Sequence, residues 1–459
     1  MRPRCTQTAA FTGALLLVAA CTFDPFGLGT EGETAPEMST GGSSSTTTGE
    51  QLDPTTSGSS TSIGDDTTGP AESTTGPNCP GGCPPSAGWT VVGKAGEGVG
   101  YAVVVDANDD VVVAGDRMQA NDPTLGNIWV GKFAGADGAP GWQMGRGGNA
   151  KREDFARAIT IAGDGTILVA GAIHETDANK ADVWLGWIDP ASGDVLAESD
   201  LGTTDWNDGD GELDEWARAL TIHPNGDLLV GGDRCKRPCE TPEAWVGRYT
   251  ATGEVAWDQP MLAFGPGAAH GLVAVGDGLV FVGTDGFEAS ASPWRSRIRQ
   301  LTSTGGGAWS ALPEDGQDDA SYEARAVARA PDGLLWVVGR SFVMDTDVGG
   351  FVRVYDPSSD VAPVAEVSDE LGGTALALVL TGSGALVGGG TGTHLWFAEL
   401  DPMLAEVWRI EEAAVDGLYT ARGLAIDGAG DIVVLGAFAA ESRAEGERLW
   451  LRKYVAASP

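Results

Sequence analysis

One loop of this chain carries carboxylates at a spacing that suits a metal ion. Its sequence is Asp208-Gly-Asp210-Gly-Glu212-Leu-Asp214, so acidic residues stand at alternate positions and Gly211 permits a sharp turn. Ca²⁺ takes about six to eight oxygen ligands, and alternating carboxylates can converge on one such ion. We predict a calcium site with side-chain ligands from Asp208, Asp210 and Asp214, and with Glu212 or its carbonyl as a fourth ligand. The alternative is a chance Asp- and Gly-rich loop in an acidic chain.

The amino terminus has the form of an export signal. Arg2 and Arg4 precede an apolar run over 9–20, which is too short to span a bilayer. The run ends in Leu-Val-Ala-Ala-Cys21, which resembles the lipobox of bacterial lipoproteins. The resemblance implies cleavage before Cys21, lipid attachment to it and, from Thr22 at the next position, sorting to the outer membrane. The alternative is an ordinary signal peptide in which Cys21 has no role.

Four further cysteines form two pairs that are each separated by three residues. They are Cys79 and Cys83 in CPGGC, and Cys235 and Cys239 in CKRPC. An even number of cysteines in an exported chain indicates disulfides. Three connectivities exist, and we favour two local bridges because each pair encloses a turn that contains Pro or Gly. A shared zinc site and a redox-active pair are the less favoured alternatives.

The charge of the chain excludes one class of partner. The full sequence has 28 basic and 65 acidic residues, a net charge of −37. Residues 1–20 contain two Arg and no acid, so the remainder has 28 − 2 = 26 basic residues against 65 acidic ones, a net charge of −39. Such a field repels phosphate backbones, so we expect no nucleic-acid partner. The negative charge serves solubility or, in the alternative, indicates a preference for divalent cations.

Composition divides the chain into three parts. After the signal at 1–20, residues 21–88 hold the lipidated cysteine and a segment rich in Ser, Thr, Gly and Pro. Such a segment buries too little apolar surface to offset its ordering entropy, so we expect a disordered tether. The rest, 89–459, forms the folded domain.

Seven copies of one pattern run through the folded domain, which is the spacing of four-stranded propeller blades or of a solenoid. Each copy has a small residue followed by an apolar one, and 12 or 13 residues later a glycine. The small residues are Ala102, Ala158, Ala219, Gly271, Ala326, Ala377 and Gly423, and the glycines are Gly115, Gly171, Gly232, Gly283, Gly339, Gly390 and Gly436.

Each copy divides into four short strands, as copy three illustrates. Residues 217–222, 228–231, 245–249 and 255–257 are its predicted strands, separated by HPNG, a long loop and TATG. The tight turns make neighbouring strands antiparallel. Third strands begin with an aromatic residue, except that Arg297 takes this place in copy four, and we assign these aromatic residues to the core. They are Trp129, Trp184, Trp245, Phe351, Trp396 and Trp450, and fourth strands carry Trp142, Trp257, Trp309 and Trp408.

The two ends of the folded domain complement each other. The seventh copy ends at its third strand, 449–455, while Trp89-Thr-Val-Val92 stands alone before the first copy. An amino-terminal strand that completes the last blade would remove both free edges. We therefore predict an all-β fold: a seven-bladed β-propeller of four-stranded antiparallel blades, closed by this strand.

The repeat consensus, clearest over 164–193, resembles bacterial propeller repeats of the SBBP type, and pieces such as YTATGEVAW resemble quinoprotein-type repeats. The SBBP resemblance covers nearly all of 89–459 and implies a propeller in the cell envelope, not an activity. The acidic loop at 208–214 resembles the calcium loop of FG-GAP-type propeller repeats, although it occurs once here.

The placement of loops favours binding over catalysis. The tight turns lie on one face, and the long segments between second and third strands and between blades lie on the other, where binding residues concentrate. Of the four histidines, we expect His223 in a tight turn, His270 at the axis, and His174 and His394 near the long-loop face. No nucleophile elbow or zinc-protease motif is present, so we predict no catalytic residue and no cofactor other than calcium.

We predict a lipid-anchored, monomeric binding or scaffold protein of the envelope or cell surface, whose long-loop face contacts a protein or a polysaccharide. The membrane is contacted through the lipid on Cys21. A propeller hydrolase or lyase acting on carbohydrate or ester substrates is one alternative. An outer-membrane assembly factor is the other.

Overall fold

The computed structural model describes residues 83–93, 98–119, 122–148, 153–174, 180–201, 213–236, 239, 241–257, 262–285, 294–311, 320–343, 346–358, 362–368, 371–413, 418–439 and 448–457. The chain divides into two units, 1–78 and 79–459, and all described residues belong to the second. The predicted signal, Cys21 and most of the predicted tether therefore lie outside the described residues.

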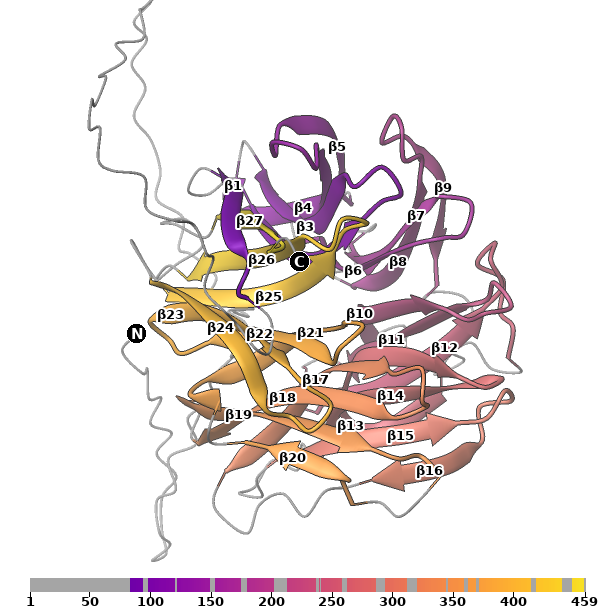
Figure 1. Ribbon diagram of the computed structural model, residues 1–459. Helices are drawn as coiled ribbons and strands as arrows, with labels where there is room; N and C mark the ends of the chain where they lie inside the picture. The colour runs from indigo at the N-terminus through magenta and orange to yellow at the C-terminus, as the bar shows by residue number, and fades with distance from the viewer. Residues whose placement is uncertain are drawn as a thin grey trace, which may run out of the picture. The chain divides into compact units, whose positions relative to one another are not determined.

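The described residues form antiparallel β-sheets and no α-helix (Figure 1). No helix among them has the length and apolar character to cross a membrane. Three four-stranded sheets each come from one stretch of sequence. The first holds β2(Val99–Val105), β3(Val111–Gln119), β4(Asp122–Phe133) and β5(Pro140–Arg146). The second holds β6(Phe155–Ile161), β7(Ile167–Ile173), β8(Asp182–Ile188) and β9(Val195–Asp200). The third holds β21(Thr374–Leu380), β22(Ala385–Gly390), β23(His394–Leu400) and β24(Glu406–Ala413).

Two further sheets complete this set of antiparallel meanders, and one is larger than the rest. One four-stranded sheet holds β17(Ser321–Arg329), β18(Leu335–Val343), β19(Thr346–Tyr355) and β20(Ala365–Val367). A seven-stranded sheet holds β10(Leu213–Ile222), β11(Leu228–Lys236), β12(Glu243–Tyr249), β13(Leu262–Val275), β14(Gly278–Asp285), β15(Arg295–Leu301) and β16(Gly307–Ala311).

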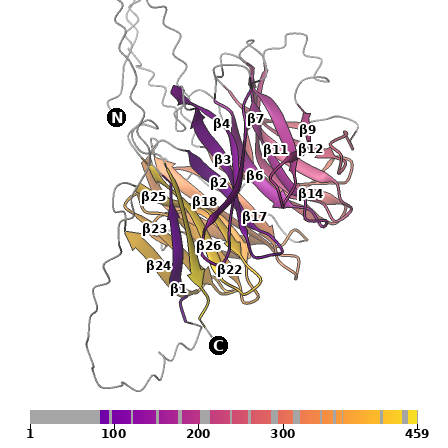
Figure 2. The same cartoon turned by 90° about the horizontal axis from the view of Figure 1, so that it is seen from above.

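The last sheet joins the two ends of the folded unit. It has the order β1(Ser86–Val92), β27(Leu449–Val455), β26(Ile432–Ala439), β25(Leu418–Ile426). Val91 of β1 pairs with Leu451 of β27, and in both Figure 1 and Figure 2 the indigo strand lies beside the yellow ones. The predicted pairing of the Trp89 segment with the final strand is therefore present.

Strand β13 corrects the prediction for copy three. Residues 255–257 were expected to be its fourth strand, but only a single bridge, Tyr249 with Val255, forms there. Leu262 and Ala263 instead pair with β12, and from Gly267 the same strand pairs with β14. Trp257 is nevertheless buried, and its indole Nε1 donates to the Ser303 carbonyl at 2.7 Å.

The apolar core lies between neighbouring sheets. One cluster joins β3 and β4 to β6, β7 and β8, and it contains Trp184. Another joins the first sheet to the sheet of β1 and β25–β27, and Trp89 and Val91 pack against it. Trp184, Trp245 and Trp396 are fully buried, which agrees with the predicted core role. Burial of such large rings contributes about 1.5–3 kcal/mol each.

The first strand of each copy contacts the first strand of the next. The contacts run β2–β6–β10–β13–β17–β21–β25, and β25 in turn contacts β2. Antiparallel meanders arranged radially, with their first strands innermost, are the pattern of a β-propeller. The coarse fold prediction is therefore confirmed.

Candidate functional site

Every first strand contains a β-bulge at the same place. Where Gly100 pairs with Gly115 and Ala102 with Ala114, the residue between them has no partner in the register. The same shift recurs in all seven copies of the pattern, always one residue before its small residue. We call the seven displaced residues the bulge residues: Tyr101, Arg157, Arg218, His270, Arg325, Leu376 and Arg422.

The bulge explains the recurrent glycine of the second strand. A Cβ added to Gly115 would lie 1.9 Å from the carbonyl oxygen of Val99, and one on Gly232 would lie 1.8 Å from that of Trp216. Because this carbonyl lies over the second strand, only glycine fits beneath it. Copy seven is looser, since a Cβ on Gly436 would lie 3.2 Å from the Thr420 carbonyl oxygen. In copy six the glycine in this position is Gly389, 1.6 Å from Thr374 O, and not the predicted Gly390.

The bulge residues are much more basic than the chain. Four of the seven are Arg, one is His and none is acidic. Lys and Arg make up 28 of 459 residues, so seven positions drawn at random would hold fewer than one. All seven are partly exposed, whereas the residue before each is small and, in six of the seven copies, an alanine. The side chains of Arg218, His270 and Arg325 are 14%, 6% and 18% exposed, so the inner strands combine a close-packed backbone with polar side chains that solvent reaches only in part.

Two of the arginines flank one tyrosine from different copies. The guanidinium of Arg157 lies 5.3 Å from the Tyr101 ring centroid, and that of Arg422 lies 5.4 Å from it. Arg157 also lies 4.4 Å from the ring of Phe155. These are cation–π distances, which hold the planar guanidinium in a fixed orientation. Residues of β2, β6 and β25 thereby meet at one point.

A buried carboxylate organises the opposite bulge residues. Glu323, 2% exposed, accepts from Arg340 Nε at 2.6 Å and lies 2.8 Å from Arg325 Nη2. The Nε2 atom of His270, on β13, lies 2.7 Å from its other oxygen. Burial alone would raise the pKa of Glu323, but Arg325, His270 and Arg340 outweigh burial and hold this pKa well below its usual range.

Positive charges from several strands act on this cluster. Burial lowers the pKa of Arg325 to about 10; Glu323 opposes the shift, and Arg340, Arg218 and Arg157 add to it. Burial also lowers the pKa of His270 to about 4, again with Glu323 opposing and with Arg325 and Arg218 adding to it. His270 is therefore neutral at neutral pH. The bulge residues of β6, β10, β13 and β17 share one electrostatic environment.

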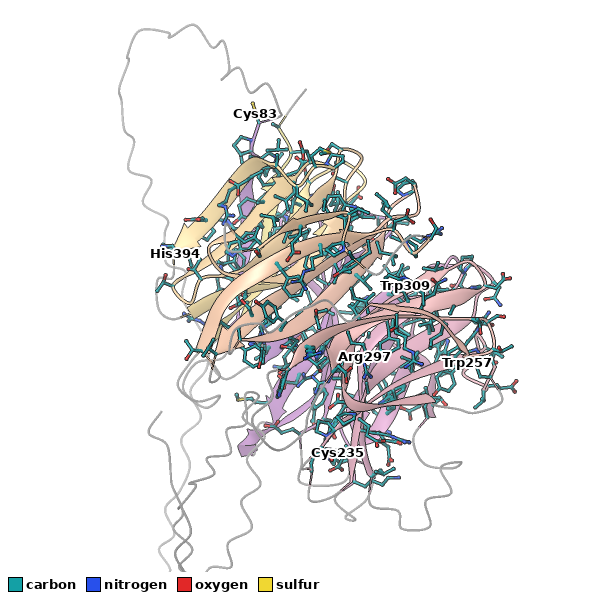
Figure 3. The ribbon with its side chains drawn as sticks, turned by 90° about the horizontal axis from the view of Figure 1, so that it is seen from below. Cys83, Cys235, Trp257, Arg297, Trp309 and His394 are labelled. Atoms are coloured by element: carbon teal, nitrogen blue, oxygen red, sulfur yellow. A yellow bond between two sulfur atoms is a disulfide. The ribbon has the colours of Figure 1, made fainter. Side chains whose placement is uncertain are left out.

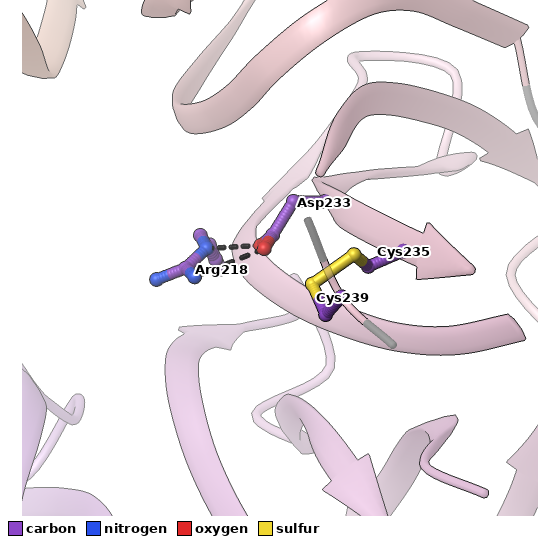
Figure 4. The surroundings of a disulfide bond; sticks show 4 residues. All are labelled: Arg218, Asp233, Cys235 and Cys239. Atoms are coloured by element: carbon purple, nitrogen blue, oxygen red, sulfur yellow. Dashed lines mark hydrogen bonds and ion pairs between the residues drawn. A yellow bond between two sulfur atoms is a disulfide. The ribbon is translucent and has the colours of Figure 1, made fainter. Parts of the chain in front are cut away.

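Arg218 is held by a neighbouring carboxylate close to a disulfide. Its guanidinium forms two bonds to Asp233 of β11, one of them from Nη2 at 3.1 Å (Figure 4). Two residues after Asp233, Cys235 is bonded to Cys239 with a Cα–Cα distance of 5.2 Å. The predicted local bridge is confirmed. Cys83 is also in a disulfide, and its predicted partner Cys79 lies outside the described residues.

The predicted calcium ligands are not brought together among the described residues. Asp208, Asp210 and Glu212 lie outside them, while Asp214 is buried in β10 and accepts a hydrogen bond from the Ala181 amide at 2.8 Å. In the described part of the chain, no group of three or more His, Cys, Asp or Glu residues is arranged to hold a metal ion. The calcium loop therefore stays a prediction.

The four histidines occupy separate environments. His174 follows β7 and its Nδ1 lies 3.1 Å from Asp154. His223 lies in the turn after β10, and its Nε2 lies 3.0 Å from the Gly276 carbonyl oxygen. His394, labelled in Figure 3, is the first residue of β23. Of the four histidines, His270 is the one among the bulge residues.

Sequence reasoning missed the bulge arginines although a signal was present. The residue before each small–apolar pair reads Tyr, Arg, Arg, His, Arg, Leu, Arg along the chain. The small residues define the repeat, whereas the residue before them varies from copy to copy, so the seven residues at this position do not stand out as a group. By contrast, the predicted place of Arg297 was right: it pairs with Gly283 as Trp129 pairs with Gly115. Figure 3 labels Arg297.

No protein-family model and no curated protein sequence matches this chain. Among solved structures it is similar to the WD40 β-propeller domain of Doa1, at 11% identity and a TM-score of 0.46, over 79% of this chain and 97% of that one. It is similar to the periplasmic gluconolactonase PpgL of Pseudomonas aeruginosa, at 14% identity and a TM-score of 0.48, over 72% and 96%. It is also similar to BamB from Moraxella catarrhalis, at 15% identity and a TM-score of 0.38, over 80% and 89%.

Proposed function

We propose that this chain is an exported binding protein that recognises its ligand at the bulge residues, with the long loops around them adding contacts. The observation that carries this proposal is the set of basic and aromatic side chains displaced at one register position of the inner strands. Binding residues set on a rigid scaffold need no helix, metal or nucleophile.

An enzymatic role as a hydrolase or lyase is the less favoured candidate. A general base works best when its pKa lies near the operating pH. His270, the histidine among the bulge residues, has a pKa lowered by burial to about 4, and Glu323 beside it is held ionised by three cationic or imidazole neighbours. Neither group is poised to exchange a proton at neutral pH. Turnover of a glycan or lactone that is lost in His270→Gln would favour catalysis instead.

The ring that presents these residues is, in our proposal, seven-bladed and closed by β1. Support comes from hydrogen bonds that repeat between blades. Trp142 Nε1 donates to the Pro190 carbonyl at 3.1 Å, joined there by Lys132 Nζ at 3.2 Å. At the closing position Trp89 Nε1 donates to the Gly135 carbonyl at 2.9 Å, joined by Lys453 Nζ at 3.1 Å.

This repetition gives closure a matched test. Trp89→Phe and Trp142→Phe each remove one indole donor and keep an aromatic ring. If both positions are interfaces between adjacent blades, each variant loses about 1 kcal/mol of unfolding free energy. A loss confined to Trp142→Phe in chemical denaturation would contradict closure by β1.

The tether and lipid anchor place the binding domain in the cell envelope in this proposal, at the outer membrane. The lipobox resemblance around Cys21 supports it. Metabolic labelling with a fatty acid should mark the parent chain and not Cys21→Ser. Label on both chains would place the fatty acid on another residue, and label on neither would mean that the chain carries no fatty acid. A role in outer-membrane assembly predicts instead that deletion depletes many outer-membrane proteins together.

The binding role itself is tested by crosslinking the full chain in native envelope fractions. A variant with Arg157→Gln and Arg422→Gln serves as the comparison, and Arg409→Gln serves as a matched control because Arg409 lies 4.5 Å from the Trp396 ring on the outer strand β24. Enrichment of one protein or polysaccharide by parent and control, but not by the double variant, supports the proposal. Equal recovery by all three chains refutes a role for the bulge residues.

A further inference from the structure

The bulge residues also indicate the chemistry of the ligand. We propose that Arg157 and Arg422, which both lie beside Tyr101, bind a carboxylate or phosphate group of the ligand. This inference rests on the proposed binding function and specifies the ligand class that the site takes.

The first argument is the orientation of the two guanidinium groups. Both lie within 5.4 Å of the same ring centroid, although they come from β6 and β25. A guanidinium held by an aromatic ring keeps a planar fork of donors, which matches the two oxygens of a carboxylate or phosphate. Since each guanidinium has five N–H donors, it can serve a protein neighbour and a ligand together.

The second argument is that the bulge arginines have different contact partners. Arg218 is engaged with Asp233, and Arg325 with Glu323, at 3.1 Å and 2.8 Å. These carboxylates are themselves buried or nearly so, with Asp233 4% and Glu323 2% exposed. Arg218 and Arg325 are thus each fixed by a carboxylate, and Arg157 and Arg422 each also lie against the Tyr101 ring.

The third argument is the effect of these charges on their neighbours. Burial first, and then the charges of Arg340, Arg218 and Arg157, lower the pKa of Arg325 even against Glu323. Arg340, Arg218 and Arg157 repel the charge of Arg325, and an anion bound nearby would relieve this repulsion. The positive charges that lower the pKa of Arg325 therefore also favour an anionic ligand.

The charge of the whole chain limits the size of this anion. At a net charge of −37 the chain repels an extended polyanion at long range. The field is screened beyond about 8–10 Å at ordinary ionic strength, so a compact ligand with one or two charges approaches the arginines at little cost. We therefore infer an isolated carboxylate or phosphate group on the ligand rather than a nucleic acid or a polyphosphate.

Isothermal titration of the purified full chain at low salt tests the inference. Glucuronate is the carboxylate probe and inorganic phosphate is the phosphate probe, so the two sources are distinguished by which one binds. We expect at least one to bind, and Arg157→Gln and Arg422→Gln each to weaken it by about 10- to 100-fold, the usual effect of losing a charge-assisted hydrogen bond. Arg409→Gln should change the affinity less than about threefold, because Arg409 lies on β24, the end strand of its sheet, and packs on Trp396 and not on Tyr101.

A gain-of-function variant guards against loss of folding. Leu376 is the bulge residue of β21 and is partly exposed. Leu376→Arg adds a fifth arginine to the set and should strengthen binding of the same probe. The inference is wrong if the parent binds neither probe, if Arg409→Gln weakens binding as much as Arg157→Gln does, or if Leu376→Arg leaves the affinity unchanged. Envelope crosslinking that still depends on Arg157 and Arg422 while both probes fail would preserve the binding function and reject only the small anion.

Discussion

A methyl group placed under the bulge should be among the costliest small changes in this protein. In Gly232→Ala the new Cβ would lie 1.8 Å from Trp216 O, 2.9 Å from its carbonyl carbon and 3.1 Å from Ala217 Cα. Ordinary contacts of this kind lie near 3.4 Å or beyond, so the backbone of β10 must move by more than an ångström. Rigid backbone, not a flexible side chain, opposes the methyl group.

The expected cost follows from that geometry. Adding a methylene-sized group to a packed interior costs about 1–3 kcal/mol, and more where backbone must shift, so we expect about 3 kcal/mol for Gly232→Ala. The matched control is Gly163→Ala in the turn after β6. No heavy atom lies within 4 Å of its added Cβ, so its stability should rise by about 0.4–1 kcal/mol or stay level.

The assay is equilibrium unfolding in urea followed by tryptophan fluorescence, together with the anion titration. Gly232→Ala should also weaken anion binding, because Arg218 is the residue that the bulge displaces. If Gly232→Ala unfolds within about 0.5 kcal/mol of the parent, the bulge does not depend on glycine, and our explanation of the repeat is wrong.

Three further predictions concern charge and cross-links. Lys453 Nζ lies 2.6 Å from Asp427 and 3.1 Å from Asp431, and Lys132 Nζ lies 2.7 Å from Asp106 and 3.1 Å from Asp110. Lys453→Met and Lys132→Met should therefore each lower the free energy of unfolding in urea by about 3–5 kcal/mol. An effect at only one of the two sites would contradict their equivalence. Burial lowers the pKa of His270 to about 4, so the unfolded chain binds a proton at a higher pH than the folded chain does. The contribution of this residue to stability should therefore fall by an amount on the order of 3 kcal/mol as the pH drops from about 6.5 to 4. Urea unfolding at several pH values should lack this loss in His270→Gln, and the same acid slope in variant and parent would refute the prediction. The Cys235–Cys239 bridge closes a short loop of sequence separation 4, so the double Ala variant should lose about 2 kcal/mol, and a larger loss would mean that the bridge does more than restrict the unfolded loop.

The strand order was predictable because tight turns force neighbouring strands together. HPNG after β10 and the lone Trp89 segment carry that information locally, and both predictions hold. The fourth strand of copy three was not predictable: Val255 and Trp257 have the pattern of a strand, but β13 supplies the longer partner for β12. Such competition between segments depends on tertiary pairing, which local pattern does not encode.

The site was hidden for a related reason. A β-bulge changes which face a residue occupies, and its position appears only once the pairing register is known. Arg157 and Arg422 are 265 positions apart and share no local motif, yet both lie beside Tyr101. The acidic loop, in contrast, was visible as a motif, and the one of its four predicted ligands that is described, Asp214, serves a backbone amide.

The continuous run of β13 through two meanders has a consequence for how the molecule comes apart. Between the other sheets, the last strand of one and the first strand of the next are distinct strands, as β9 and β10 are, so one sheet can open without its neighbour. Between β12 and β14 the hydrogen-bonded ladder changes partner at Pro266 and Gly267 with no loop between. We expect the amide protons of β10–β16 to exchange with solvent as one cooperative unit, and an inserted segment at this junction to be tolerated less well than at the others.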